Sequence, residues 1–245
     1  MRARQLGLPF LHEASYQEAD FVPAPSNLDA LAWLGQPWPG GRLALWGGEG
    51  TGKTHLLHAW AYRAGAAVLY GPELRRWRAE ARARVAPWAL AVDDADLAMG
   101  RATDEVALLH LLNAADEAGR TVLLTGREPP SRWPAALPDL ASRLRATAAV
   151  PLGPADEGLL HVLLARVLSE RQLAVPRPVQ DWLLLRLPRT AAAVRAAAAR
   201  LDRLALARGG PVTRALAGEA LAGIAEDDTS VADAAPVSPS DALLL

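Results

Sequence analysis

A glycine-rich segment with a single lysine constrains the fold of this chain more than any other feature. Lys53 is the only lysine among 26 basic residues, and it lies in the sequence GGEGTGKT at residues 47–54. This segment matches the pattern G-x-x-x-x-G-K-[ST] of phosphate-binding loops. An apolar run at residues 43–46 predicts a buried strand before it, and residues 55–60 predict a helix after it. A chance glycine-rich turn would not need a strand before it and a helix after it. The pattern therefore predicts a strand–loop–helix unit.

The residues of this loop have the chemistry to bind a nucleotide. Glycines allow several backbone amides to turn toward one anion, and the N-terminus of a helix adds its positive dipole end. We expect Lys53 to contact the β and γ phosphates of ADP or ATP, and Thr54 to ligate Mg²⁺. In a chain that otherwise uses arginine, the lone lysine indicates a need for a compact point charge. The predicted nucleotide-binding residues of the loop are Gly47, Gly48, Glu49, Gly50, Thr51, Gly52, Lys53, Thr54 and His55.

Two aspartates follow another apolar run. Residues 89–92 deliver Asp93 and Asp94 to the predicted carboxyl edge of the sheet, where open α/β sheets bind ligands. We expect Asp93 to contact the Mg²⁺ of the nucleotide, directly or through water, opposite Thr54. Asp94 is expected to orient or deprotonate an attacking water. An aspartate pair after a strand also occurs as a simple turn or helix cap, but its position after the loop favours the magnesium and catalytic roles.

Strand and helix patterns alternate at first and are then followed by helices alone. Strands are expected at residues 43–46, 67–70, 88–92 and 121–124, and helices at 55–60, 73–85, 103–118, 155–172, 178–187, 190–207 and 213–224. This order predicts a doubly wound parallel α/β domain followed by a small all-helical lid. The predicted parts are a leader at 1–25, the α/β base at 26–153, the lid at 154–224 and an acidic disordered tail at 225–245.

Composition adds only broad limits. The 245 residues suffice for one large domain with a small satellite. The chain has no cysteine, so it forms no disulfide, which fits a reducing cytoplasm. Without a targeting pattern or a run of roughly eighteen apolar residues, a cytoplasmic protein with no membrane partner is expected. The net charge of −1 gives no general basic field, so DNA contact is expected only locally or through a partner.

Several motifs together resemble one known family. The phosphate loop, the two aspartates, the strand end LTGREPP at residues 124–130, the run DLASRL at 139–144 and the helical lid resemble the AAA+ core of the bacterial replication initiator DnaA. The resemblance covers about residues 20–224 and implies an AAA+ P-loop NTPase that binds ADP or ATP with Mg²⁺. Because only the acidic tail follows the lid, no DnaA-type C-terminal DNA-binding domain is expected. The same truncation is found in Hda-type regulators, DnaA homologues that inactivate the initiator.

The N-terminus provides an independent test of this resemblance. The sequence QLGLPF at residues 5–10 resembles the short peptide by which replication proteins, Hda-type regulators included, bind the DNA polymerase sliding clamp. Apolar anchors and a proline that restrains an extended chain suit docking in a pocket. The predicted clamp-binding residues are Gln5, Leu6, Leu8, Pro9 and Phe10. The alternative is an apolar leader that packs on the core of its own chain.

Arg143 has the position of a catalytic arginine that acts on a neighbouring molecule. In assemblies of the resembled family, an arginine of one subunit contacts the γ phosphate bound by the next and stabilises charge during hydrolysis. Ser142 and Arg143 match that motif position, whereas Arg145 is expected to point elsewhere on a helix. The resemblance implies that the acceptor is DnaA. The alternative is an arginine in a surface ion pair.

Two positions depart from the DnaA pattern. Arg127 replaces the polar residue expected after the fourth strand, and a cationic side chain cannot position water in the same way. Ala192 replaces the lid arginine that contacts nucleotide in the family, although Arg189 and Arg195 lie one turn away on either side. These changes predict weak or absent intrinsic hydrolysis with nucleotide binding intact.

The sequence therefore predicts a clamp-associated AAA+ regulator of replication initiation that promotes hydrolysis of DnaA-bound ATP. Its expected partners are DnaA, the sliding clamp (beta subunit) and, through the clamp, DNA. A homo-oligomer is compatible with the same motifs. Two alternatives stay open: an autonomous ATPase that loads or remodels a helicase, as DnaC-like proteins do, and a non-hydrolysing accessory factor of DnaA.

Overall fold

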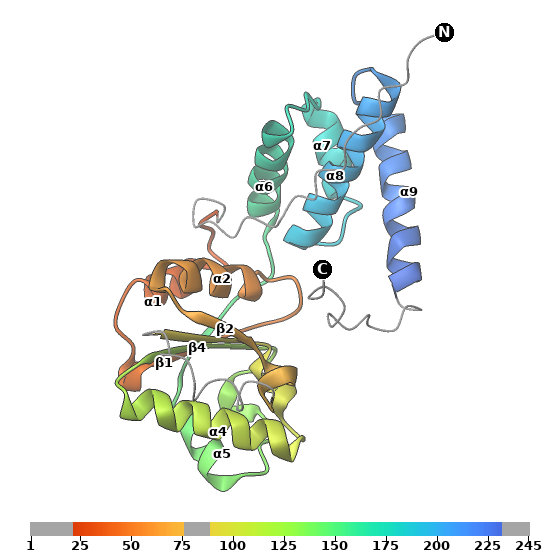
Figure 1. Ribbon diagram of the computed structural model, residues 1–245. Helices are drawn as coiled ribbons and strands as arrows, with labels where there is room; N and C mark the ends of the chain where they lie inside the picture. Colours follow the sequence, from red (N-terminus) through yellow and green to blue (C-terminus); the bar gives the residue numbers. More distant parts are fainter. Residues whose placement is uncertain (1–21, 76–88, 232–245) are drawn as a thin grey trace, which may run out of the picture. The chain divides into compact units, whose positions relative to one another are not determined.

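The computed structural model describes residues 22–75 and 89–231 (Figure 1). The described chain divides into two compact units. The sheet unit contains Asp29–Gly47 and Gly52–Pro151, and the helical unit contains Val22–Leu28, Gly48–Thr51 and residues 152–231. The predicted clamp peptide at residues 5–10 and most of the predicted helix at 73–85 lie outside the described residues.

A five-stranded parallel sheet forms the centre of the sheet unit. Its strands are β1 (Arg42–Trp46), β2 (Ala67–Tyr70), β3 (Ala89–Asp93), β4 (Thr121–Gly126) and β5 (Ala148–Pro151). Their spatial order, β2-β3-β4-β1-β5, places β1 inside the sheet. The strands align at their carboxyl ends, since Trp46 lies opposite Gly126 and Tyr70 lies opposite Asp93. Residues that directly follow these strands therefore meet at one edge.

The apolar runs of the sequence predict four of the five strands. All five residues of β3 are buried, as expected for a parallel strand covered on both faces. β5 is an additional strand that the sequence analysis does not predict. Its sequence, AAVP, lacks a strong strand pattern, and it pairs only with β1 at the edge of the sheet. β5 therefore depends on β1 for its hydrogen bonds.

Helices cover both faces of the sheet. α2 (Lys53–Ala64) lies on one face, whereas α4 (Ala102–Glu117) and α5 (Pro138–Arg145) lie on the other (Figure 1). α1 (Leu28–Leu34) precedes β1 and is not predicted by the sequence. Short 3-10 turns lie at η2 (Pro39–Gly41), η3 (Gly71–Glu73), η4 (Ala95–Ala98) and η5 (Pro130–Arg132). Leu108 and Leu111 of α4, Leu140 of α5 and Leu124 of β4 pack in one core. The doubly wound parallel α/β fold is thereby confirmed.

Helices alone make up most of the described helical unit: α6 (Glu157–Glu170), α7 (Arg177–Leu184), α8 (Ala191–Arg208) and α9 (Arg214–Val231). The side chain of Asp156 accepts from the Leu159 amide and that of Thr190 accepts from the Ala193 amide, which fixes the starts of α6 and α8. Apolar side chains from all four helices pack in a separate core. α9 continues past residue 225, where the sequence predicts the tail to begin. Within the described residues, no helix combines the length and apolarity needed to cross a membrane.

Candidate functional site

The glycine-rich segment leaves β1 at Gly47 and enters α2 at Lys53. Two of its glycines have left-handed φ angles, 73° at Gly50 and 98° at Gly52, which residues with a side chain rarely adopt. Gly52 is also the N-cap of α2. The first amides of a helix have no partner within it and point toward its N-terminal end. The backbone of this loop and of the first turn of α2 therefore has the geometry to bind an anion.

Lys53 is buried at the start of α2, with 8% of its surface exposed. Its Nζ donates a hydrogen bond to the Gly47 carbonyl oxygen at 2.8 Å. Burial lowers the pKa of Lys53, and the carboxylates of Asp94, Asp96 and Asp93 oppose this effect. The amine is thus held beside the first residue of the loop.

The other predicted loop residues differ in accessibility. Gly48, Glu49 and Thr54 are exposed, whereas Thr51 and His55 are half-buried. The Thr51 hydroxyl donates to the Gly48 carbonyl oxygen at 3.0 Å, which supports the turn. Solvent therefore reaches Gly48 and Glu49 of the loop and Thr54 at the start of α2.

Asp93, the last residue of β3, accepts two hydrogen bonds at its Oδ1 atom. The hydroxyl of Thr125 in β4 donates at 2.6 Å, and the hydroxyl of Thr54 in α2 donates at 3.2 Å. The structure therefore brings together the two side chains that the sequence predicts to hold Mg²⁺. The sequence pattern does not single out Thr125 as a site residue. Its only signal is a polar residue directly after three buried apolar residues of the same strand.

Asp94 adopts a left-handed φ of 48° directly after β3. Its backbone amide donates to the Thr125 hydroxyl at 2.8 Å. Its carbonyl oxygen lies so close to Gly71 that a Cβ atom there would overlap it. Burial first, and then the charges of Asp93 and Asp96, raise the pKa of Asp94. A raised pKa makes this carboxylate a stronger proton acceptor, a property that suits a general base.

The donor set at this edge fits a nucleotide with Mg²⁺. Mg²⁺ prefers oxygen ligands and usually takes only one or two from the protein, with phosphates and waters completing its shell. In the part of the chain that the structure describes, no group of three or more His, Cys, Asp or Glu side chains could hold a metal ion by itself. The hydroxyl of Thr54 and the carboxylate of Asp93 are the residues that would hold it, next to phosphates contacted by Lys53.

Arg127 follows β4 at the same edge of the sheet. Its backbone amide donates to Asp96 Oδ2 at 2.8 Å, and its side chain is exposed. The Arg127 charge adds to the burial that lowers the pKa of Lys53, and it opposes the rise in the pKa of Asp94. This edge of the sheet therefore carries a cation at the position that the sequence analysis compares with a polar residue of DnaA. The other positions in that comparison, all exposed near the start of α8 in the helical unit, are Arg189, Ala192 and Arg195.

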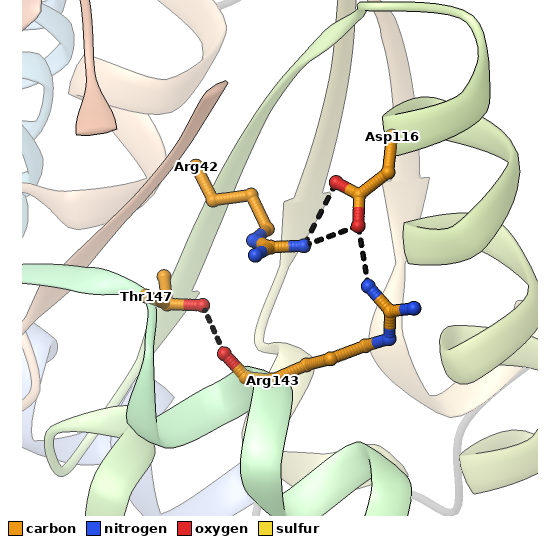
Figure 2. Close-up of polar contacts among 4 residues, drawn as sticks. All are labelled: Arg42, Asp116, Arg143 and Thr147. Carbon is orange, nitrogen blue, oxygen red and sulfur yellow. Dashed lines mark hydrogen bonds and ion pairs between the residues drawn. The ribbon is translucent and has the colours of Figure 1, made fainter. Parts of the chain in front are cut away.

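Arg143 belongs to a second charged cluster, in the last turn of α5. Its Nη1 forms an ion pair with Oδ2 of Asp116, which lies near the end of α4 (Figure 2). Arg42, at the start of β1, donates its own Nη1 to both oxygens of Asp116, at 2.8 and 2.7 Å. The Thr147 hydroxyl donates to the Arg143 carbonyl oxygen at 2.9 Å. Arg143 therefore does form an ion pair within its own chain, and its role toward a neighbouring molecule stays a prediction.

The cluster of Arg42, Asp116 and Arg143 lies at the amino edge of the sheet, opposite the loop. Arg42 begins β1, whereas Gly47 directly follows its last residue. A strand rises about 3.3 Å per residue, so these two positions are about 16 Å apart along the strand. Arg143, which contacts the same carboxylate as Arg42, is therefore far from the phosphate loop of its own chain.

A parallel sheet in the order β2-β3-β4-β1-β5, with a glycine-rich loop after β1 and an aspartate at the end of β3, defines an AAA+ P-loop NTPase fold. The fold is similar to domain III of the replication initiation protein DnaA from Thermotoga maritima, with a TM-score of 0.74 and 20% sequence identity over 86% of this chain and 97% of that chain.

Two further solved structures have the same fold. AMPPCP-bound DnaA from Aquifex aeolicus has a TM-score of 0.66 and 18% identity, covering 80% of this chain and 68% of that one. The Thermotoga maritima RuvB Holliday junction branch migration motor has a TM-score of 0.56 and 16% identity, covering 86% and 75%. No protein-family model matches the sequence. At these identities, the likeness establishes the fold.

Proposed function

We propose that this chain is a clamp-associated AAA+ regulator that promotes hydrolysis of DnaA-bound ATP and so inactivates the replication initiator. The observation that carries the proposal is the position of Arg143. Arg143 contacts the same Asp116 carboxylate as Arg42, which begins β1, whereas the phosphate loop follows the other end of that strand. A γ phosphate that contacts Arg143 must therefore belong to another molecule. The fold similarity to DnaA domain III supports DnaA as that molecule.

The chain's own site is proposed to bind ADP or ATP. Loop amides and Lys53, whose Nζ lies beside Gly47, would contact the phosphate groups. Thr54 and Asp93, whose side chains are hydrogen-bonded, would hold Mg²⁺, which neutralises phosphate charge when it is bound. Asp94 orients or deprotonates water in any hydrolysis at this site. Because Arg127 supplies a cation where a polar residue is expected, intrinsic hydrolysis is proposed to be weak.

In the partner's site, Arg143 is proposed to stabilise the charge that develops on the γ phosphate during hydrolysis. An arginine supplied in this way can raise the rate by about 10³ to 10⁵. A guanidinium is suited to the task because its planar fork contacts two oxygens together. The chain would thus complete a catalytic site whose nucleotide is bound by DnaA.

A second function, an autonomous ATPase that loads or remodels a helicase, is favoured by one observation. Thr54, Asp93 and Asp94 lie together beside the chain's own loop, so side chains for hydrolysis in cis are present. Rapid turnover by the purified chain, together with binding to single-stranded DNA, would support this alternative. Turnover that requires DnaA supports the main proposal.

The test is single-turnover hydrolysis of ATP prebound to DnaA, with DNA-loaded clamp present. The wild-type chain is expected to accelerate hydrolysis, and Arg143→Ala is expected to lose this acceleration while it still binds nucleotide and clamp. Arg145→Ala is the matched control, because Arg145 is an exposed arginine in the same helical turn. If Arg143→Ala accelerates hydrolysis as well as wild type, the trans mechanism is wrong and steric inhibition of DnaA assembly becomes the better account.

A further inference from the structure

Asp116 joins three elements of the sheet unit through two arginines. It lies near the end of α4 and contacts Arg42 of β1 and Arg143 of α5 (Figure 2). The contacts are unequal: Arg42 binds both carboxylate oxygens, whereas Arg143 binds only Oδ2 through its Nη1. The exposed fractions of the side chains are 12% for Arg42, 32% for Asp116 and 34% for Arg143. Arg42 is thus the more buried of the two arginines, and Arg143 is the more accessible to solvent.

The contact with Arg42 holds the Asp116 carboxylate in place. Arg42 Nη1 donates to both oxygens, and a charge-assisted contact of this kind is stronger than one between neutral groups. Oδ2 is therefore kept within reach of Arg143. The backbone of Arg143 is fixed as well, because Thr147 donates to its carbonyl oxygen and is itself buried, with 7% of its surface exposed. Arg143 is restrained at both ends of its side chain.

The contact with Asp116 leaves most of the Arg143 guanidinium available. An arginine carries five N–H donors, and this ion pair uses Nη1 alone. The other guanidinium nitrogens of Arg143 point away from Asp116 (Figure 2). Two arginines and one carboxylate also leave one surplus positive charge in the cluster. The cluster can therefore hold Arg143 and still attract an anion to it.

We propose that Asp116 is a positioning residue that orients Arg143 toward the γ phosphate bound by the partner molecule, with Arg42 fixing Asp116 in turn. This inference rests on the proposed function, in which Arg143 acts in trans. It assigns the ion pair a role during the reaction: Arg143 keeps its bond to Asp116 while its other nitrogens contact the phosphate oxygens. A pre-oriented guanidinium loses less side-chain freedom when the transition state forms. Asp116 therefore affects the catalytic step more than association.

The test measures DnaA-bound ATP hydrolysis as a function of the concentration of the full chain. Asp116→Asn keeps the shape of the side chain but removes its charge. We expect the maximal rate to fall about tenfold, since small misplacements of a catalytic group can cost up to about a hundredfold. The concentration for half-maximal stimulation should change less than about twofold, because the variant leaves the proposed clamp and nucleotide contacts untouched. Glu117→Gln, which removes an exposed charge from the neighbouring position of α4, is the control and should keep the wild-type rate.

Two further variants separate positioning from general stability. Arg42→Lys keeps the charge but replaces the rigid guanidinium by an ammonium on a flexible stem, so it should hold Asp116 less well and lower the maximal rate in the same direction even if Asp116→Asn folds poorly. In an Arg143→Ala background, Asp116→Asn should cause no additional loss, since the residue it positions is already gone. Melting temperatures of all variants, measured with nucleotide, identify any variant whose loss of rate comes from unfolding.

The outcomes distinguish this inference from the function on which it rests. Full activity of Arg143→Ala contradicts the proposed function itself. If Arg143→Ala is inactive while Asp116→Asn and Arg42→Lys keep the wild-type maximal rate, the function stands and the positioning role is wrong. A rise in rate on removing the Asp116 charge also overturns it, because Asp116 would then compete with phosphate for Arg143. A variant that changes only the concentration for half-maximal stimulation would show that Asp116 contributes to association with DnaA. That result would also overturn the proposal.

Discussion

Single side chains of the nucleotide site are held by hydrogen bonds that cross from one element to the next. Lys53 of α2 donates to Gly47 at the end of β1. Thr125 of β4 donates to Asp93 of β3 and accepts from the amide of Asp94. A buried polar group that loses its partner costs about 1–3 kcal/mol. Substitutions at these positions should therefore have measurable effects on binding or stability.

Lys53→Ala removes the cation expected to meet the β and γ phosphates. We expect the affinity for ADP and ATP to fall at least about tenfold, or about 1.4 kcal/mol, because the chain has no second lysine to take over the contact. Titration calorimetry on both proteins measures the difference. Saturating nucleotide should also raise the melting temperature of the wild type. Equal affinities in the two proteins would remove the basis for assigning the loop to nucleotide binding.

Thr125→Val replaces the hydroxyl that joins Asp93 to the Asp94 amide by a methyl group of similar size. Two polar groups then lose a partner beside a fully buried position, so the free energy of unfolding should fall by about 1–3 kcal/mol. Urea denaturation measures this change. Thr125→Ser keeps the hydroxyl and is the control. If the valine and serine variants are equally stable, the Thr125 hydroxyl does not stabilise the edge of the sheet that carries Asp93 and Asp94.

At the scale of elements, apolar runs and glycine signals were sufficient to predict most of the sheet unit. β3 is recognisable because all its residues are apolar up to Asp93, and the loop is recognisable from its glycines and lysine. β5 was missed because AAVP has no strand pattern of its own and forms only by pairing with β1. α1 was missed because it is a single short segment of seven residues. Local sequence thus predicts elements that are strongly apolar and misses those that depend on a neighbour.

Contacts between elements were the part of the site that the sequence could not provide. Arg143 and Asp116 are 27 residues apart, and Arg42 and Asp116 are 74 residues apart. In a chain with 25 arginines among 26 basic residues, no spacing rule selects one arginine–carboxylate pair. The parallel order of β4, β1 and β5 brings these helix and strand ends to one edge. The cluster therefore follows from topology and not from a motif.

The close approach of η3 and η4 gives a prediction about backbone packing. A Cβ atom at Gly71 would overlap the backbone carbonyl of Asp94, which cannot rotate away as a side chain could. Gly71→Ala should lower the free energy of unfolding by about 1–3 kcal/mol. Gly210→Ala is the matched control, because a Cβ there meets nothing within 4 Å, and it should change stability by less than about 0.5 kcal/mol. Equal stability of the two variants in urea would show that the two turns separate more easily than their packing implies.

For the whole molecule, we propose that the N-terminal peptide at residues 5–10 recruits the chain to the sliding clamp. Replacing Gln5, Leu8 and Phe10 together with alanine should abolish retention on immobilised sliding clamp, since apolar anchors supply most of the affinity of such peptides. Nucleotide affinity measured by calorimetry should not change, because these residues lie outside the loop motif. Equal retention of the wild type and the triple variant would indicate that this segment packs on the core of its own chain instead.

The sheet unit carries two sets of charged side chains at opposite edges of one sheet. The carboxyl edge holds Lys53, Asp93 and Asp94, which suit binding of the chain's own nucleotide. The amino edge holds Arg143, in contact with Asp116. In the proposed function, the carboxyl edge binds nucleotide in cis and the amino edge acts in trans. This separation also makes the two activities separable by substitution.

Labelled ATP on DnaA can show whether Asp94 or Arg143 is required for its hydrolysis. DnaA carrying γ-labelled ATP is mixed with loaded clamp and with a chain bearing either Asp94→Asn or Arg143→Ala, and phosphate release is followed over a single turnover. We predict that Asp94→Asn stimulates release to within about twofold of wild type, whereas Arg143→Ala reduces the stimulation by about a thousandfold, to the unstimulated rate. Loss of stimulation with Asp94→Asn and full stimulation with Arg143→Ala would instead place the essential hydrolysis in the chain's own site and contradict the account.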